Sequence, residues 1–275
     1  MRIFFTKMHA AGNDFLILDC LKAEILDAPT LARTLCKRHY SVGADGLVLV
    51  LPSKIADFQM KIFNADGSEA QMCGNAARCV GKWLYERGHI KKTRVTLETI
   101  SGKRTLFLTV RDHTVCSVAI EMGEVRTGEM FFSEAAGEKF VRREGNVGND
   151  HQVAFVPDVD YVNFERIGTA FQKNPRFEGG INTEFCEILD ENYIKMRVFE
   201  RGCGETLACG TGACAAAVAG ILNGSCDGSR PIKIEMRGGE VRVVCYGEQG
   251  AMLIGDANFV FDGYADLVLD KNSNV

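Results

Sequence analysis

The sequence predicts an α/β (α+β) protein of two pseudo-symmetric domains, each a curved mixed or antiparallel sheet wrapped around a buried central helix. Three observations carry this prediction: the chain repeats itself at a constant offset, each repeat contains a largely apolar helical segment, and short apolar runs flank that segment. We place the first domain at residues 1–120 and the second at 121–263, and we expect residues 264–275 to return to the first.

The repeat is visible in the tripeptide Gly-Asn-Asp, which begins at Gly12 and again at Gly148, an offset of 136 residues. At this offset, FQMKIFNADGSEAQMCGNAARC from residue 58 aligns with IKMRVFERGCGETLACGTGACA from residue 194. The register holds from about residue 12 to residue 102, and its identities include glycines and one pair of cysteines, Cys73 and Cys209. Chance identity among common residues would not cluster in this way, so we interpret the repeat as an internal duplication.

Apolar periodicity predicts the same order of elements in each copy. Alternating or continuous apolar runs predict strands in the first copy at 2–8, 15–19, 46–51 and 59–63, and a meander at 94–121. The corresponding strands of the second copy are predicted at 152–156, 183–189 and 195–199, with a meander at 233–261. Turn signals divide the meanders at Ser101-Gly102, Arg111-Asp112 and Gly238-Gly239.

Helices are predicted at 30–38 and 75–87 in the first copy, and at 164–172 and 211–222 in the second. The segment TGACAAAVAGIL is apolar on every side, which is typical of a helix buried all round. Its counterpart NAARCVGKWLYERG begins in the same way and becomes amphipathic, and we expect Arg78 and Lys82 to lie on its solvated face. A buried helix surrounded by strands is the reason for expecting a sheet wrapped around it.

Composition excludes several classes of protein. A net charge of −4 argues against a nucleic-acid partner, which would require a basic surface. No apolar run reaches the roughly 18 residues of a membrane span, and the N-terminal residues do not resemble a secretion signal. The chain has 11 cysteines, an odd number, and nothing suggests export, so we expect reduced thiols in a cytoplasmic protein. The expected partner is therefore a small molecule, with no membrane and no nucleic acid.

Two matched motifs carry the predicted chemistry: Cys73-Gly74-Asn75-Ala76 and Cys209-Gly210-Thr211-Gly212. Each cysteine stands at the start of a predicted helix, where free backbone N–H groups and the helix dipole bind an anion. The same field is expected to lower a thiol pKa from about 8.5. If a pseudo-two-fold axis brings the helix starts to one cleft, a thiolate and a thiol would approach a substrate from opposite faces. That arrangement inverts a stereocentre by proton transfer.

The copies differ in polarity at their equivalent positions. His151 replaces Phe15, Asn182 replaces Gly46, Glu200 replaces Asn64 and Arg201 replaces Ala65 in the second copy, which also contains Asn149. Such asymmetry suits a substrate whose two ends are treated differently, and Arg201 is suited to a second carboxylate.

At these residues the chain resembles the diaminopimelate epimerase family. The resemblance rests on NADGSEAQMCGNAARC, ERGCGETLACGTGACA, KMHAAGNDFLILD, RHYSVGADGLVL and NPRFEGGINTEF, and it covers nearly the whole chain. It implies interconversion of LL- and meso-2,6-diaminopimelate in lysine and cell-wall synthesis, with no cofactor, neither pyridoxal phosphate nor metal. Members of this family often form homodimers, which we carry over as an expectation.

The resemblance also implies roles for particular residues. Cys73 and Cys209 become the acid/base thiols, with His151 and Glu200 supporting proton handling. The implied substrate ligands are Asn13, Asn64, Gly74, Asn75, Asn149, Asn182, Glu200, Arg201, Gly210 and Thr211. Two positions depart from the family pattern: Asp150 stands where proline is usual and adds a negative charge, and Gly46 stands where some members have glutamine.

The residues alone leave three other interpretations open. A zinc site from Cys73, Cys209, His151 and Glu200 is conceivable, but no Cys/His pair close in sequence nucleates it. A redox protein is disfavoured because neither motif cysteine belongs to a C-x-x-C unit. An amino-acid-binding module would need only the anion sites and would not need two thiols.

Overall fold

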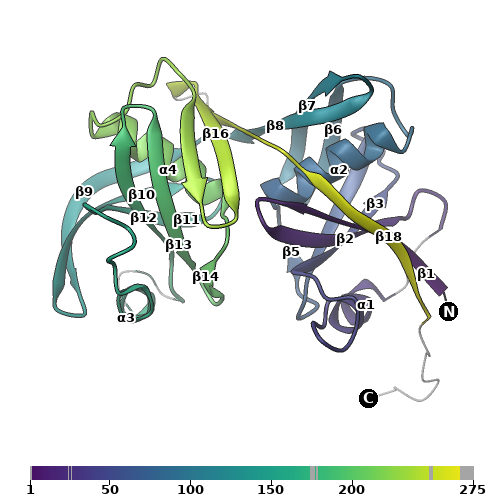
Figure 1. The fold of residues 1–275 in the computed structure, drawn as a ribbon, viewed down its shortest axis with the longest axis horizontal. Helices are drawn as coiled ribbons and strands as arrows, with labels where there is room; N and C mark the ends of the chain where they lie inside the picture. Colours follow the sequence, from purple (N-terminus) through teal and green to yellow (C-terminus); the bar gives the residue numbers. More distant parts are fainter. Residues whose placement is uncertain are drawn as a thin grey trace.

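The computed structural model describes residues 2–23, 25, 27–173, 177, 179–247 and 250–266. It has two lobes, one formed by the first half of the chain and one by the second, with β18 running from the second lobe to the first (Figure 1). None of the helices in these residues is long and apolar enough to cross a membrane.

The first half follows the predicted order of elements closely. Its elements are β1 (Arg2–Ala10), β2 (Asn13–Asp19), α1 (Ala28–Leu35), β3 (Gly46–Leu51), β4 (Phe58–Asn64), β5 (Glu69–Ala70), α2 (Gly74–Glu86), β6 (Arg94–Thr99), β7 (Gly102–Arg111) and β8 (Thr114–Gly123). Helix α1 begins after Asp27, whose side chain accepts a hydrogen bond from Thr30 N as an N-cap. The predicted meander at 94–121 is the three-stranded run β6–β8.

The second half contains the predicted elements and one hairpin that the sequence analysis missed. Its elements are β9 (Arg126–Ala135), β10 (Glu138–Asn146), β11 (Asp150–Phe155), α3 (Phe164–Gln172), β12 (Asn182–Asp190), β13 (Tyr193–Glu200), β14 (Gly204–Thr206), α4 (Gly210–Leu222), β15 (Ile232–Met236), β16 (Gly239–Cys245), β17 (Ala251–Gly255) and β18 (Asn258–Asp266). The missed pair is β9–β10, a long and partly exposed hairpin.

The offset of 136 residues between Gly12 and Gly148 also relates the observed elements. It carries β1 onto β10 and α2 onto α4 without any change of bounds. The parallel pairing of Phe15 with Gly46 between β2 and β3 becomes the pairing of His151 with Asn182 between β11 and β12. The two copies therefore share strand pairing as well as sequence, as the duplication predicts.

The copies meet at an antiparallel pair formed by β8 and β17, which are themselves equivalent strands. Val118 pairs with Gly255 and Ala119 pairs with Ile254, so each residue faces the equivalent of its neighbour. Such reciprocal pairing is what a two-fold axis between the copies requires.

The last strand β18 then pairs with β1 from Arg2 to His9, which returns the chain to the first lobe from Asn258 onward. The division into domains at residues 1–120 and 121–263 stays a prediction. Residues 267–275 of the predicted return lie outside the described part of the chain.

Each copy buries one helix and packs a second on the opposite face of its sheet. On β2, Phe15 and Ile17 face the cluster around α2, whereas Leu16 and Leu18 face the cluster that holds α1. Strands covered on both faces read as continuous apolar runs, which explains the sequence of β2 and β3. In the second copy α4 lies in the shared central cluster and α3 packs on a separate phenylalanine-rich cluster.

The prediction that α2 presents a solvated face is wrong. Every residue from Gly74 to Leu84 is buried, and Arg78 and Lys82 are only 0% and 9% exposed. The Lys82 ammonium donates to Val115 O at 2.9 Å, because β8 packs along this side of the helix. A charged residue late in an apolar pattern normally marks the solvent side, and here the sheet wraps further around the helix than the pattern indicates.

Candidate active site

Cys73 and Cys209 occupy the N-cap positions of α2 and α4 with nearly identical extended backbones. Their φ and ψ angles are −142° and 118°, and −130° and 112°. A Cβ atom on Gly74 would lie 3.1 Å from Leu253 Cδ2, and one on Gly210 would lie 2.8 Å from the same atom. The glycine after each cysteine thus lets both helix starts pack against one leucine of β17, which brings the two motifs together.

Cys73 belongs to a network of amide side chains. Its sulfur lies 3.7 Å from Asn13 Oδ1, which also accepts from Asn75 Nδ2 at 3.3 Å. Asn75 Oδ1 in turn accepts from Arg78 Nη2 at 2.6 Å, and Asn13 Nδ2 donates to Asp45. Three of the predicted residues, Cys73, Asn13 and Asn75, therefore form one connected group with the buried guanidinium behind it.

Cys209 is 7% exposed and is contacted by the start of its own helix. Gly212 N donates to its sulfur at 3.4 Å, and Thr211 Oγ1 lies 3.4 Å from it. These donors stabilise a negative sulfur and are the contacts that the helix-start argument predicts.

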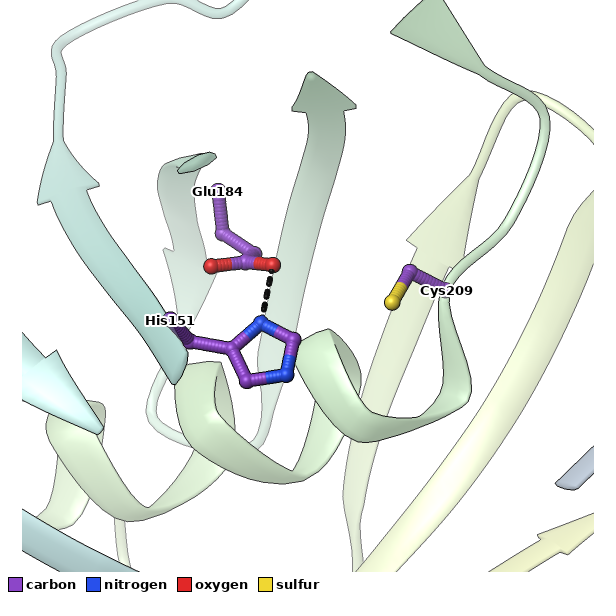
Figure 2. A group of neighbouring side chains, drawn as sticks. All are labelled: His151, Glu184 and Cys209. Atoms are coloured by element: carbon purple, nitrogen blue, oxygen red, sulfur yellow. Dashed lines mark hydrogen bonds and ion pairs between the residues drawn. The ribbon is translucent and has the colours of Figure 1, made fainter. Parts of the chain in front are cut away.

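His151 and Glu184 are completely buried beside Cys209 (Figure 2). His151 Nδ1 donates to Glu184 Oε1 at 2.7 Å, and Nε2 lies 3.1 Å from Asn149 Oδ1. Ligand atoms of His151, Glu184 and Cys209 all lie within 4.8 Å of one another. His151 and Cys209 are far apart in the sequence, but the fold brings them together with Glu184, and these three donors are of the types that zinc accepts. Because His151 and Glu184 share a short hydrogen bond, they form a dyad beside the Cys209 thiol.

The pKa values of both thiols contradict the expectation of a net lowering by the helix starts. Burial raises the pKa of Cys73, whereas the N–H groups of Ala76 and Asn75 and the charge of Arg78 lower it. Burial raises the pKa of Cys209 still further, aided by the carboxylates of Glu200 and Glu184. The helix starts act in the predicted direction, but the cost of burying a charged sulfur outweighs them.

After burial, the charge of Glu200 at the end of β13 is a further cause that raises the pKa of Cys73 and of Cys209. Its carboxylate accepts from Thr206 Oγ1 at 2.5 Å. Burial raises the pKa of Glu200 itself. A carboxylate whose charge acts on both thiols is the group of the second copy best suited to meet a substrate ammonium group.

The remaining predicted ligands divide into two sets. Arg201, Asn149 and Thr211 line a cavity of about 440 Å³, together with residues of the first copy, Gln71, Met72, Ser101, Arg104 and Met122. Asn182 Oδ1 accepts from Arg201 N at 2.9 Å and fixes the backbone that carries this arginine. Asn64 is not among the residues that line this cavity; it is exposed and donates a hydrogen bond to Ser68 Oγ at 2.9 Å.

The departure at Asp150 has a local structural explanation. Asp150 Oδ1 accepts from Asn146 Nδ2 at 2.6 Å, and Asn146 Oδ1 accepts from Gly148 N at 3.0 Å. These side-chain bonds hold the turn that a proline ring would otherwise restrict. Asp150 also lines the 440 Å³ cavity, so its charge lies at the edge of the candidate site.

The sequence analysis missed two features of the site. It did not identify Glu184, and it placed Arg78 in solvent although this side chain is buried. The offset held a signal for Glu184, because this residue aligns with Val48, a buried residue of the apolar strand β3. A carboxylate in place of a core valine indicates a functional group, since a lone charge is rarely buried without a partner.

The model of the family described as diaminopimelate epimerase matches residues 5–128 and 145–260. The chain belongs to this family. The two matched segments follow the two copies of the duplication, each with its cysteine helix. Curated diaminopimelate epimerases of Acetivibrio thermocellus and Pelotomaculum thermopropionicum are 41% and 44% identical, covering 96% and 94% of this chain and 98% and 97% of the relatives.

Solved structures of other epimerases and racemases share the fold of this family member. A hydroxyproline epimerase from Agrobacterium vitis has a TM-score of 0.75 at 16% identity, covering 96% of this chain and 92% of that one. A probable proline racemase from Agrobacterium radiobacter has a TM-score of 0.77 at 17% identity, covering 99% and 94%. At these identities the likeness concerns the fold, two copies of a sheet and central helix.

Proposed function

We propose that this protein is a diaminopimelate epimerase, an isomerase that interconverts LL- and meso-2,6-diaminopimelate by moving the α-proton between Cys73 and Cys209. One observation carries the mechanism: two cysteines cap equivalent helices, and both helix starts pack against Leu253 at the junction of the copies. One thiol would then approach the α-carbon from each face. The family membership and the relatives over 40% identical support the substrate.

In this proposal the thiolate removes the α-proton from one face while the opposite thiol donates a proton to the other. Charge that develops on the α-carboxylate is stabilised by the backbone N–H groups of Gly74-Asn75 and Gly210-Thr211 at the two helix starts. Substrate ammonium and distal carboxylate would contact Glu200 and Arg201, aided by Asn13, Asn64, Asn149 and Asn182. The polar set of the second copy distinguishes the reacting end from the distal end.

The reaction needs no electron sink beyond the carboxylate and the helix starts, so we propose turnover without an added cofactor. We further propose that the enzyme acts in the cytoplasm, where its thiols stay reduced, in lysine and cell-wall precursor synthesis. A homodimer is also proposed: Phe4 and Tyr264 are exposed and lie opposite each other on the paired strands β1 and β18, with ring centroids 5.9 Å apart, an apolar surface of the kind that partners cover.

The substrate is tested by incubating reduced protein with LL-2,6-diaminopimelate, and separately with proline, glutamate and lysine, in the absence of added cofactor. We expect meso product from diaminopimelate and no inversion of the other three. Inversion of another amino acid alone would keep the two-thiol chemistry and refute the substrate. Light scattering of the same sample gives its oligomeric state, and a monomer at micromolar concentration would refute the dimer.

A further inference from the structure

Two charged side chains behind the thiols are fully buried, and neither has a charged counterpart in the other copy. Arg78 of α2 is 0% exposed and aligns with Cys214, while Glu184 of β12 is 0% exposed and aligns with Val48. A buried charge destabilises the fold unless it is well paired. Each charge destabilises one copy, and the equivalent position of the other copy lacks it. This difference suggests that each charge serves the reaction.

Arg78 reaches Cys73 through two amide side chains. Its Nη2 holds Asn75 Oδ1 at 2.6 Å, Asn75 Nδ2 holds Asn13 Oδ1 at 3.3 Å, and that oxygen lies 3.7 Å from Cys73 Sγ. Among the described residues, Nε and Nη1 of Arg78 have no hydrogen-bond partner. Gly255 leaves the room for this side chain, since a Cβ there would overlap Nη1. The ionisable groups that face Arg78 are Cys79, Asp256, Cys73 and Cys214.

Glu184 lies beside Cys209, and ligand atoms of the two residues are within 4.8 Å of each other. Its Oε1 holds His151 Nδ1 at 2.7 Å, and its Oε2 has no partner in the part of the chain that the structure describes. Gly212 makes room for the carboxylate, where the first copy has Ala76. The ionisable groups around it are His151, Cys209, Cys186 and Glu200.

We propose that Arg78 and Glu184 are positioning residues that bias the two thiols in opposite directions, so that Cys73 releases its proton before Cys209. This inference rests on the proposed function. A cation near Cys73 favours its thiolate, and an anion near Cys209 favours its thiol. Glu200 acts on both sulfurs in the same sense, whereas Arg78 and Glu184 act in opposite senses. The distinction therefore depends on the two unmatched charges.

The bias assigns a proton balance to one catalytic cycle. At the start Cys209 Sγ holds the proton and Cys73 Sγ is the thiolate. Cys73 takes the substrate α-proton while Cys209 gives its own to the opposite face, which leaves the proton on Cys73. Release of one proton from Cys73 to solvent and uptake of one by Cys209 restores the starting form, and the buried charges favour this return.

The test measures the ionisation of each thiol separately in the substrate-free enzyme. Iodoacetamide, a neutral reagent that consumes thiolates, is applied from pH 6 to pH 10, and peptide mass spectrometry follows Cys73 and Cys209 individually. In the wild type we expect the midpoint of Cys73 to lie below that of Cys209. Arg78→Met should lower Cys73 labelling at neutral pH about tenfold and leave Cys209 unchanged, and Glu184→Gln should raise Cys209 labelling about tenfold.

Matched variants separate charge from simple packing. Arg78→Lys keeps the cation and should restore most of the Cys73 labelling. Lys82→Met removes another buried cation one turn along α2, which donates to Val115 O and lies 3.5 Å from Glu86 Oε1, and it should move neither midpoint. If Arg78→Met does not fold, Arg78→Gln with its folded state checked by circular dichroism replaces it.

An unchanged Cys73 midpoint in a folded, uncharged Arg78 variant would overturn the proposal, as would an equal shift in Lys82→Met. Failure of the proposed function would be distinguishable, because the midpoints are measured without substrate. An enzyme with the predicted midpoints and no action on diaminopimelate would refute the function and leave the bias intact.

Discussion

The starts of α2 and α4 have the same backbone and opposite surroundings. Both place a cysteine at the N-cap and a glycine against Leu253. Behind Cys73 lies a guanidinium linked through amide groups, whereas behind Cys209 lies a carboxylate linked to an imidazole. The duplication supplies the geometry, one thiol for each face of a substrate, and the later divergence supplies the chemical difference between them.

Symmetry itself limits how charges can be placed near the junction. Arg78 and Cys214 occupy equivalent positions and influence each other across the axis. If both copies carried arginine there, two buried cations would meet, at a large electrostatic cost. A charged residue near the axis can therefore occur in one copy but not at the equivalent position of the other. The two copies must differ at such positions, as they do at Arg78 and Cys214.

The largest effect is expected from removing either thiol. Cys73→Ala and Cys209→Ala should each lower epimerisation at least about 1,000-fold, because each deletes one of the two proton-transfer groups. Conversion of LL-diaminopimelate to the meso isomer is measured by chiral chromatography, with Cys116→Ala as an exposed-cysteine control. Near wild-type turnover in either site variant would show that one thiol suffices.

The next effect compares two equivalent positions, Glu200 and Asn64. Glu200→Gln should lower kcat/KM about 100-fold, because a carboxylate beside both thiols is lost, while Asn64→Ala should cost about tenfold. Steady-state kinetics with LL-diaminopimelate measures both. Equal losses at the two positions would mean that the copies contribute alike to substrate binding.

The pH dependence of wild-type kcat/KM should follow the raised thiol pKa values. Since burial raises the pKa of both Cys73 and Cys209, the proportion of enzyme with one thiolate grows as pH increases beyond the ordinary thiol range of about 8.5. Activity should therefore be lost as pH falls from that range. A profile already flat from pH 6 to pH 8 would indicate that the helix starts dominate over burial.

A stability comparison comes from exchanging one core pair between the copies. Gly212→Ala should destabilise the fold by about 1–3 kcal/mol, because a Cβ there would overlap the Glu184 carboxylate. Adding Glu184→Val recreates the Val48/Ala76 pair of the first copy and should recover much of that loss. Urea unfolding of the two single variants and the double variant gives the coupling, and strict additivity would refute the contact.

The smallest effect is expected at the edge of the site. Asp150→Asn keeps the side-chain bond from Asn146 and removes a charge that lines the cavity, so KM for diaminopimelate should change by less than about threefold. Measured at low and moderate salt, a change above tenfold would mean that Asp150 contacts the substrate directly.

Much of this architecture could be predicted from the sequence because duplication leaves a fixed register. From the sequence alone, the offset located α2 and α4, the paired glycines and the difference between Phe15 and His151. The offset did not lead to a prediction of β10, although this strand matches β1. Apolar and polar residues no longer alternate cleanly in β10, and its partner β9 has no equivalent before β1.

Local sequence does not show the burial of the Arg78 and Glu184 charges, although the replacement of Val48 by Glu184 in the second copy pointed to one of them. Arg78 and Glu184 contradict the rule that charged residues face solvent, and their burial depends on Gly255 and Gly212, which lie far away in the sequence. The thiol pKa values depend on the same tertiary packing. Sequence shows the field of the helix start, but only the fold shows how deeply each sulfur is buried.

The central claim, proton transfer between two thiols on opposite faces, is tested most directly by isotope content at early turnover. LL-2,6-diaminopimelate is incubated with the enzyme in D2O, and recovered substrate and meso product are analysed by NMR after less than a tenth of the reaction. Because separate groups remove and donate the proton, we predict deuterium at the inverted α-carbon of the product and protium in the recovered substrate. Equal labelling of substrate and product from the outset would contradict two bases and indicate a single group serving both faces.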